Sequence, residues 1–591
     1  MSSLGLVPND SVYNLVSFTV LANGQDLTTE VEVFSITVTH DLNRIPFARL
    51  VLRDGDPSQE DFVLSNERHF EPGSEIEVAV GYDANNESIF KGIVVRHAVR
   101  VRANGDSELT IECKDVAVKT TVGRKDRVFL ESKDSDALSK ILRDYAGINA
   151  SVAATPEKHP ELVQYHCSDW DFVLSRAEAN GLLAVVYNGD FKIKAPTTSG
   201  SPAFTLTYGL DLLEFEAEMD VRTQLKATKA SSWSYADQKV TEKTGKEPSV
   251  NNQGDLTGKK LSDVVGLKEY ELRHGGKVSE QELKAWADAQ LLKSRLAKIQ
   301  GRLRCQGTAQ AKPDTLIELQ GLGNRFNGLA YVSGVRHEIR DNNWLMWVQI
   351  GLAPDWLADR RDVMALPAAG LLPGINGLQI GKVAKIADDP DGEHRVQVKL
   401  PLIDPNGEGL WARVATLDAG NQRGTFFRPE VDDEVVVGFL NDDPRDPIVL
   451  GMLHSSKLSA PLTADAANPE KGYFSREGLR LLFNDEKKSI TVDTPGGHSL
   501  VMDDDAGSIV VKDSNGNELT LDSAGITLKS GKDITLDATG KIVLKAAQDL
   551  TAEGLNVSLA ANAQFKAEGS AGAEVSTSAI AVLKGSLVQI N

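Results

Sequence analysis

The carboxyl-terminal part of the chain carries short apolar pairs at a nearly constant interval. The stretch from 526 to 544 reads ITLKSGKDITLDATGKIVL, and small or charged residues with a Gly separate its apolar pairs. The first members of successive pairs are Ile490, Leu500, Ile509, Leu519, Ile526, Ile534 and Ile542, and Leu550 continues the series. Apolar side chains at every second position predict strands with one buried face. The intervening Ser, Gly and Asp residues predict turns.

Strands this short cannot bury their apolar face alone, so the repeat predicts a stacked, solenoid-like core. Two closures fit the pattern: one chain winding three successive strands into each coil, or three chains sharing one axis. Each repeat turns only two side chains inward, which favours the thin shared axis of a homotrimer over a wide single-chain coil. The predicted trimer core includes Ile526, Leu528, Ile534, Leu536, Ile542 and Leu544.

Before this repeat, residues 377–455 alternate short apolar strands with turns. The strands read QIGKVAKI, RVQVKLPL, GLWARVATL, DEVVVGFL and DPIVLGML. Five strands in about eighty residues predict a small closed barrel of the OB type. The segment has 8 Lys and Arg against 14 Asp and Glu, which argues against oligonucleotide binding. ADDPDGEH (387–394) places Ala387 where a calcium loop needs its first ligand, so it predicts a hairpin turn.

The part of the chain ahead of this barrel shows an internal duplication. Residues around Ile76-Glu77-Val78, Phe90-Lys91-Gly92 and Val95-Arg96-His97 recur around Ile317-Glu318-Leu319, Phe326-Asn327-Gly328 and Val335-Arg336-His337, at offsets of 236 to 241. Two similar β-barrels separated by an insert are expected. Two helices are expected as well. One opens at Ser135 with an Asp or Ser cap and stops at Gly147, and the other spans 279–300.

These patterns divide the chain into five predicted domains and a mainly β fold. They are a first barrel (1–130), an α/β insert (131–235), a second barrel with a leading helix (236–372), an OB barrel (373–460) and the octad-repeat needle (461–591). At 591 residues the chain is long enough for several domains.

Composition narrows the function classes. A net charge of −20 argues against a general nucleic-acid binder, and no nucleic-acid partner is expected. Three widely spaced cysteines, Cys113, Cys167 and Cys305, form neither a disulfide framework nor a metal knuckle. The start, MSSLGLVPNDSVYNL, lacks the basic and apolar segments of a signal peptide, so synthesis in the cytoplasm is expected.

Catalytic motifs are missing from the sequence. His337-Glu338 is not followed by the second histidine of HExxH, GxSxG does not occur, and Lys243-Thr244-Gly245 lacks its companion motifs. GLGNRFNG (321–328) precedes a strand-like stretch where a phosphate loop requires a helix, so it predicts a turn. We therefore expect no catalytic residues, no metal, no cofactor and no enzyme activity.

Two further stretches carry a family resemblance. GTFFRPEVDDEVVVGF (424–439), followed by DPRDPIVLG (443–451), resembles the barrel of the VgrG family, the spike proteins of type VI secretion systems, contractile phage tails and extracellular injection particles. SDWDFVLSRAEANGL (168–182) is similar to that family's signature in its amino-terminal base. The repeat resembles the family's triple-stranded β-helix, so the likeness covers nearly the whole chain.

The resemblance implies a mechanical function at the tip of a contractile injection machine. A duplicated base in three chains offers six similar units to a hexameric inner tube and the baseplate, and the needle punctures the target envelope as effectors are delivered. A PAAR-repeat tip protein would cover the apolar end at Leu587, Val588, Gln589, Ile590 and Asn591. The alternative that these residues merely finish the core stays open.

A rival from another class also has a trimeric β-helix: a phage-tailspike-like protein that binds or cleaves glycans. It would need wide coils and paired carboxylates in a groove between chains. The thin repeats argue against it.

Overall fold

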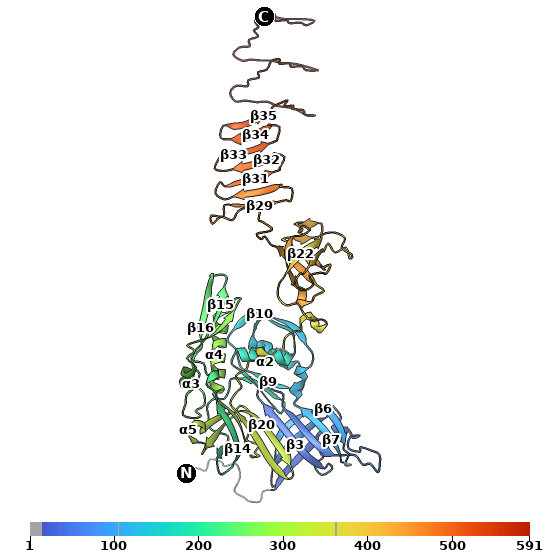
Figure 1. The fold of residues 1–591 in the computed structure, drawn as a ribbon, viewed down its shortest axis with the longest axis vertical. Coiled ribbons are helices and arrows are strands. Elements are labelled where there is room, and N and C mark those ends of the chain that lie inside the picture. Colours follow the sequence, from blue (N-terminus) through green and yellow to red (C-terminus); the bar gives the residue numbers. More distant parts are fainter. Residues whose placement is uncertain (1–14, 104–105, 361–362, 591) are drawn as a thin grey trace. The chain divides into compact units, whose positions relative to one another are not determined.

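The computed structural model describes residues 15–103, 106–360 and 363–590. The chain divides into two compact units, Met1–Gly451 and Met452–Asn591, and each is described by itself (Figure 1). In both units most of the regular secondary structure of the described residues is β-strand, so the predicted mainly β fold is confirmed.

The amino-terminal part forms the first copy of a repeated sheet. Its strands alternate buried and exposed residues, as β4 does with Ala48, Leu50 and Leu52 inside. The elements are β1 (Val16–Ala22), β2 (Gln25–Asp26), β3 (Val33–Asp41), β4 (Phe47–Arg53), β5 (Glu75–Tyr82), β6 (Asn85–Val101) and β7 (Ser107–Lys114), with 3-10 turns at Arg68–Phe70 and Val116–Thr121.

The second copy lies later in the chain. Its elements are β13 (Thr205–Thr207), β14 (Leu212–Met219), β18 (Ile299–Gln306), β19 (Leu316–Gln320), the four-residue helix α5 (Gly323–Phe326), β20 (Gly328–Arg340) and β21 (Asn343–Ile350). The strand β20 follows the glycine-rich stretch directly, as the sequence predicted.

The strand order establishes the duplication. The first copy runs β3-β4-β7-β6-β5-β1, and the second runs β14-β18-β21-β20-β19-β13. If the six strands of each copy are numbered in chain order, both copies have the same spatial order, 2-3-6-5-4-1. The copies differ in one pairing, since β1 is antiparallel to β5 whereas β13 is parallel to β19. Because β13 and β14 belong to the second copy, its sheet begins at Thr205, ahead of the predicted start at 236.

The two copies are joined in one 13-stranded sheet rather than standing as separate barrels. β3 pairs antiparallel with β20, from Asp41 opposite Gly334 to Ser35 opposite Arg340. A Cβ at Gly334 would lie 2.2 Å from a carboxylate oxygen of Asp41, so a larger residue there would have to displace the Asp41 side chain.

Two histidines are buried at this seam. His40 Nε2 lies 2.8 Å from the Ile89 carbonyl oxygen, and the indole N–H of Trp344 donates to His337 Nδ1 at 3.3 Å. Burial lowers the pKa of His40 to about 4 and that of His337 to about 3, so both are neutral at pH 7.

An α/β insert separates the copies. It contains β8 (Lys125–Lys133), α1 (Asp134–Arg143), β9 (Asn149–Val152), β10 (Lys158–Cys167), α2 (Asp169–Ala179), β11 (Leu183–Tyr187) and β12 (Asp190–Lys194). Ser168 caps α2 by accepting from the Asp171 N–H at 3.1 Å. The predicted cap of α1 is wrong: the helix already begins at Asp134, its N-cap Lys133 makes no side-chain bond, and the hydroxyl of the distant Thr155 accepts the Ser135 N–H in the first turn. The helix also ends at Arg143, before Gly147.

A second insertion interrupts the second copy alone. β3 and β4 are joined by residues 42–46, whereas a 3-10 turn and five elements stand between the equivalent strands β14 and β18. They are Val221–Thr223, β15 (Thr228–Ser234), β16 (Lys239–Thr244), α3 (Gly258–Val265), β17 (Tyr270–His274) and α4 (Glu280–Leu296). Ser279 caps α4 through the Glu282 N–H at 3.1 Å, close to the predicted start.

The next segment is a closed five-stranded barrel, which confirms the predicted OB fold. Its strand order is β22-β23-β24-β28-β27, and its core includes Val383, Val396 and Val437. The bounds are β22 (Gln379–Lys385), β23 (Val396–Lys399), β24 (Leu410–Val414), β27 (Glu434–Phe439) and β28 (Pro447–Met452), with a hairpin of β25 (Ala419–Gly420) and β26 (Arg423–Gly424). The 3-10 turns Leu357–Asp359 and Pro367–Gly370 precede the barrel, and Leu440–Asp442 lies within it.

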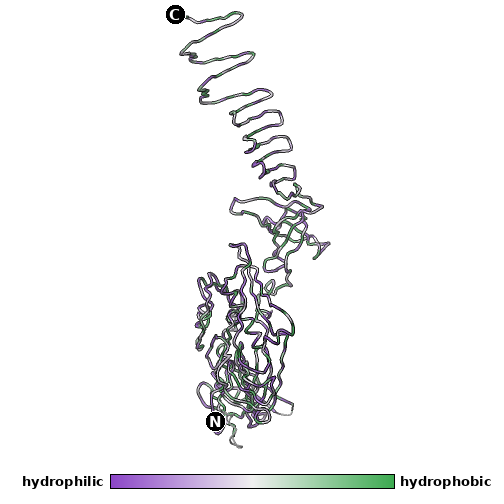
Figure 2. Tube along the Cα trace, turned by 90° about the vertical axis from the view of Figure 1, so that its left-hand side faces the viewer, coloured by the Kyte–Doolittle hydropathy of each residue, from purple (hydrophilic) through white to green (hydrophobic). Residues whose placement is uncertain are grey.

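The second unit begins as an antiparallel meander in which each strand pairs with the next. The seven strands are β29 (Glu470–Phe474), β30 (Arg480–Asn484), β31 (Ser489–Asp493), β32 (Ser499–Asp503), β33 (Ser508–Lys512), β34 (Glu518–Asp522) and β35 (Gly525–Lys529). From Ser530 to Ile590 no residue is assigned to a strand. There the chain zigzags with its successive crossings apart from one another (Figures 1 and 2).

Candidate functional site

One face of the meander carries two columns of apolar side chains, which we call the apolar face. Strand register places each member opposite the next, because every strand presents alternate residues to the same side. One column is Ile490, Met502, Ile509, Leu521 and Ile526, and the other is Val492, Leu500, Val511, Leu519 and Leu528.

The apolar face is not covered within the chain. Val492, Ile509 and Val511 are 40–43% exposed, and Leu528 is 55% exposed. The other side of the meander carries the middle residues of the strands, such as Thr491, Thr520 and Thr527. A continuous apolar stripe on a free sheet is typical of a surface that another chain covers.

The predicted core residues fall on both sides of the change at Ser530. Ile526 and Leu528 lie on β35 and belong to the apolar face. Ile534, Leu536, Ile542 and Leu544 lie in the zigzag segment and are 51–67% exposed. Within the described residues 530–590, no backbone hydrogen bond links one crossing to the next. Backbone N–H and C=O groups need hydrogen-bond partners when they are buried, so burial of these apolar stretches would require partners from beyond the neighbouring crossings.

The predicted tip residues lie at the end of the zigzag segment. Leu587 is 76% exposed, Val588 44% and Ile590 86%, and Gln589 is exposed as well. Asn591 lies outside the described residues. The role of these side chains in binding a tip protein stays a prediction.

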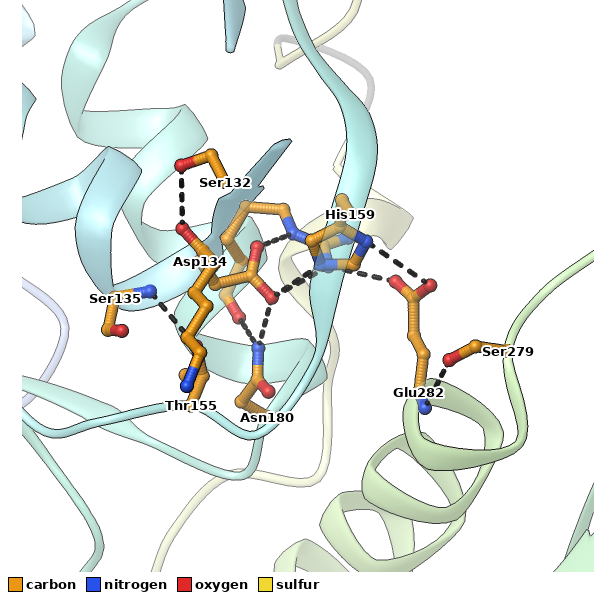
Figure 3. A network of polar contacts seen from close by, with 10 residues as sticks. Ser132, Asp134, Ser135, Thr155, His159, Asn180, Ser279 and Glu282 are labelled. Atoms are coloured by element: carbon orange, nitrogen blue, oxygen red, sulfur yellow. Dashed lines mark hydrogen bonds and ion pairs between the residues drawn. The ribbon is translucent and has the colours of Figure 1, made fainter. Parts of the chain in front are cut away.

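A dense polar network lies far from the needle in sequence, and sequence reasoning missed it (Figure 3). Arg176 on α2 donates to both Asp134 oxygens, at 2.6 and 3.0 Å, and to Glu282 Oε1 at 2.8 Å. His159 Nε2 lies 3.1 Å from Asp134 Oδ2, and Asn180 donates to the same oxygen at 2.9 Å. Arg176 and Asn180 lie within the signature stretch 168–182, which was the signal available.

The charged groups of this network attract one another and join four elements of the fold, and we call the network the clamp. Burial opposes ionisation of Asp134, which is 1% exposed, but hydrogen bonds from His159 and Arg176 hold its pKa well below the usual range. The hydrogen bond to Asp134 raises the pKa of His159. Within the described residues, no hydroxyl or thiol hydrogen-bonds to His159. The arrangement therefore holds α1, β10, α2 and α4 together and offers no nucleophile.

Other candidate chemical sites have structural explanations. ADDPDGEH is the β22–β23 hairpin, as predicted, and Asp389 accepts there from the Arg395 guanidinium at 2.7 Å and from its N–H at 3.0 Å. In the described part of the chain, no group of three or more His, Cys, Asp and Glu side chains could hold a metal ion. Nor does any helix there have the length and apolar character to cross a membrane.

Three family models match the chain in succession. The Alg8 N-terminal domain matches residues 12–341. The type VI secretion system/phage-baseplate injector OB domain matches 379–454, and the phage baseplate V C-terminal trimerisation domain matches 489–591. The last two matches coincide with the closed barrel and with the meander and zigzag segment.

Curated relatives match over shorter segments. The type VI secretion system spike protein VgrG3 of Vibrio cholerae is 34% identical over 100 residues, which is 15% of this chain and 9% of that protein. VgrG1b of Pseudomonas aeruginosa is 30% identical over 112 residues, or 18% of this chain and 15% of that protein. The matched segments thus span less than a fifth of these relatives.

Solved structures resemble the chain more loosely. A tail protein of Neisseria meningitidis MC58 gives a TM-score of 0.42 at 13% identity, covering 58% of this chain and 98% of its own. The E. coli c3393 protein, a type VI secretion component, gives a TM-score of 0.38 at 12% identity, and the match covers 73% of this chain and 99% of that protein.

The first family model alone spans more than half of the chain, and the OB and trimerisation domains follow it in order. The chain therefore belongs to the family of the Alg8 N-terminal domain, and its later segments carry the injector OB and trimerisation domains and resemble VgrG-type spike proteins.

Proposed function

We propose that this protein is the structural spike of a contractile injection machine and acts as a homotrimer. The observation that carries the proposal is the uncovered apolar face of β31–β35, which continues into a zigzag segment without internal pairing. Three copies around one axis would bury the apolar columns against each other. They would also fill the gaps between crossings of the zigzag with strands of the other two chains.

The needle formed in this way suits puncture of an envelope. Strands paired around a closed axis leave no free edges, so every backbone group finds a partner inside the assembly. Such a needle could enter lipid without unfolding. We propose that it is expelled into or through the target envelope during effector delivery, with a PAAR-repeat tip protein on residues 587–591.

The base supports a role in docking to an inner tube. Two copies of one strand order occur in each chain, so three chains would present six similar sheet halves around the axis. Six such units match a hexameric tube and the baseplate around it. The insertion at 220–298, present in the second copy alone, leaves the six units only approximately equivalent.

We further propose that the protein works mechanically and not as an enzyme. The polar network around Asp134 has its carboxylates engaged by Arg176, His159 and Asn180, and no hydroxyl or thiol of the described residues hydrogen-bonds to its histidine. A glycan-cleaving spike would instead need two carboxylates facing an open groove.

The decisive measurement is the mass of the purified full-length chain by light scattering, together with its circular dichroism. A folded trimer is expected. A folded monomer with full β content would overturn the proposal, because the apolar face would then be stable without partners. Particles carrying a chain that ends at Lys529 should contract but fail to permeabilise target membranes.

A further inference from the structure

A pocket in the amino-terminal unit is explained by neither the needle nor the docking of the base. It has a volume of about 290 Å³ and lies where the β3–β4 loop, α2, α4 and residues 352–360 meet. We call residues 352–360 the strap, because they follow β21 and lead along the chain to the OB barrel. Ligand sites in proteins are commonly found at such junctions, at volumes of roughly 300 Å³ and more. Every lining residue belongs to one chain, so the pocket does not depend on the proposed trimer.

Much of the pocket wall is apolar. Leucines from α2, from the turn after it, from α4 and from the strap line the pocket, and they include Leu174, Leu182, Leu292, Leu296, Leu352 and Leu357. Covering such a wall removes apolar surface from water, which favours a ligand with an apolar body.

The strap is fixed against the two helices by an ion pair that is largely buried. The Glu178 carboxylate on α2 accepts from the Leu357 N–H at 2.7 Å and pairs with Lys293 on α4. Lys293 also donates to the Asp355 carbonyl oxygen, and its ammonium lies 5.2 Å from the centre of the Trp356 ring. The strap wall is therefore preformed, as ligand sites usually are, and the charges of Glu178 and Lys293 already balance each other.

Hydrogen-bond donors at the pocket lack partners among the described residues. The indole N–H of Trp356 is buried yet makes no hydrogen bond, whereas buried polar groups are nearly always paired. The guanidinium groups of Arg44 and Arg360 make no hydrogen bond or ion pair with the described residues. Two carboxyl groups, Asp41 and Asp355, line the pocket as well, and burial raises the pKa of Asp41 while the charge of Arg44 opposes that rise. An indole N–H only donates, so the group that satisfies it must be an acceptor.

We propose that this pocket binds a small organic carboxylate with an apolar body. The carboxylate accepts a hydrogen bond from Trp356 and pairs with Arg44, since a guanidinium matches the geometry of a planar carboxylate. The loop that carries Arg44 is held in place, because Asn43 and Ala184 exchange two hydrogen bonds of 2.9 Å. The apolar body lies against the leucines. Because the strap forms part of the wall, the bound acid ties the strap to α2 and α4 more firmly than the Glu178 contact alone.

Isothermal titration calorimetry of the full-length protein with octanoate tests the proposal. Saturable binding of one octanoate per chain is expected. Octanol and octylammonium carry the same chain without the carboxylate and should bind at least about tenfold more weakly, because a hydrogen bond to a charged group is worth about tenfold or more in affinity. Absence of saturable octanoate binding would overturn the proposal. So would equal or tighter binding of octylammonium, since Asp41 and Asp355 would then be the partners of the head group.

Matched variants test the position of the site. Trp356→Phe keeps an aromatic ring but removes the N–H and should weaken octanoate binding about fivefold, whereas Trp233→Phe, on β15 and outside the pocket, should leave it unchanged. Ala289→Phe places a ring in the pocket from α4 and should abolish binding. Circular dichroism checks that each variant folds, and the milder Trp356→Phe decides the outcome if Ala289→Phe does not fold. Equal affinities in the two tryptophan variants would place octanoate elsewhere, such as on the apolar face, and would refute the proposal.

Amide hydrogen exchange supplies a second readout. Octanoate should slow exchange in peptides that cover 352–360 and leave peptides that cover 228–244 unchanged. Exchange in the strap that does not respond to saturating octanoate would contradict the assignment of this wall. Light scattering of the same samples reports the trimer separately, so a failure of octanoate binding leaves the proposed spike function untouched.

Discussion

Replacing Leu528 by Asp tests whether the apolar face is the core of an assembly. Leu528 lies at the end of a column, opposite Leu519, and is 55% exposed in the single chain. Covering that remaining surface is worth about 1 kcal/mol per chain, taking roughly 1.5–3 kcal/mol for a fully buried leucine. A carboxylate in its place adds a desolvation cost of several kcal/mol per copy.

Threefold symmetry multiplies this penalty. Three copies would bring three like charges to one level of the axis, so the free energy of trimer formation would become less favourable by on the order of 10 kcal/mol. Since about 1.4 kcal/mol is a tenfold change in an equilibrium constant, this loss is enough to abolish the trimer. Trimers should become undetectable by light scattering at concentrations where the unmodified protein is fully trimeric.

The adjacent residue supplies the control. Thr527 lies on the other side of β35, opposite Thr520, so Thr527→Asp should leave the trimer largely intact. The same contrast is expected in the zigzag segment between Leu536→Asp and Asp537→Ser, from the register read in the sequence. If both changes on β35 disrupt the trimer equally, or if Leu528→Asp remains trimeric, the apolar face is not the core.

Three further predictions concern the seam, the clamp and the tip. Burial lowers the pKa of His337 to about 3 from an ordinary value of 6.5, so between these two pH values only the unfolded chain binds a proton at this side chain. The free energy of unfolding should therefore fall by up to about 5 kcal/mol as the pH falls from 6.5 toward 3. Urea unfolding between pH 7 and 4 should show a shallower loss of stability in His337→Gln, and identical slopes would contradict this. Arg176→Ala leaves Asp134 buried without its main counter-charge and should lower the unfolding free energy by about 3–5 kcal/mol. The control Arg222→Ala removes an exposed ion pair and should leave the unfolding free energy nearly unchanged. Equal losses in the two variants would show that the Asp134 network does not stabilise the fold in this way. Deleting 587–591 should leave a trimer that no longer retains a PAAR-repeat protein in a pull-down, and undiminished binding would place the tip site elsewhere.

Local signals in the sequence carried much of this architecture. The capping serines Ser168 and Ser279 each accept from an N–H three residues later, so short-range chemistry fixes where α2 and α4 begin. Alternation within each octad assigns the apolar face for the same reason, since neighbouring side chains on a strand must point to opposite sides. The barrel and the duplication followed from turn spacing and from a constant offset between similar segments.

Other features depend on pairings between residues that are distant in the chain. β3, near the start, joins β20, which lies in the second copy, and Arg176 on α2 bonds to Glu282 on α4, so no local pattern encodes either contact. The cap expected for α1 was wrong because α1 begins at Asp134, so Ser135 lies inside the helix, and Thr155, twenty residues away, accepts the Ser135 N–H.

The needle shows most clearly which features depend on the sequence alone and which depend on the tertiary structure. Its repeat was read as one series, yet the strands up to Lys529 pair within the chain while the crossings after Ser530 do not. Every repeat is long enough for a short strand and a turn, so the interval alone does not say whether a strand folds back on its predecessor or stays apart from it. The sequence thus determined which side chains share one side of each strand, because that depends on adjacent residues. Which strand supplies each backbone partner was decided only in three dimensions, because hydrogen bonds between strands carry no side-chain signature along the chain.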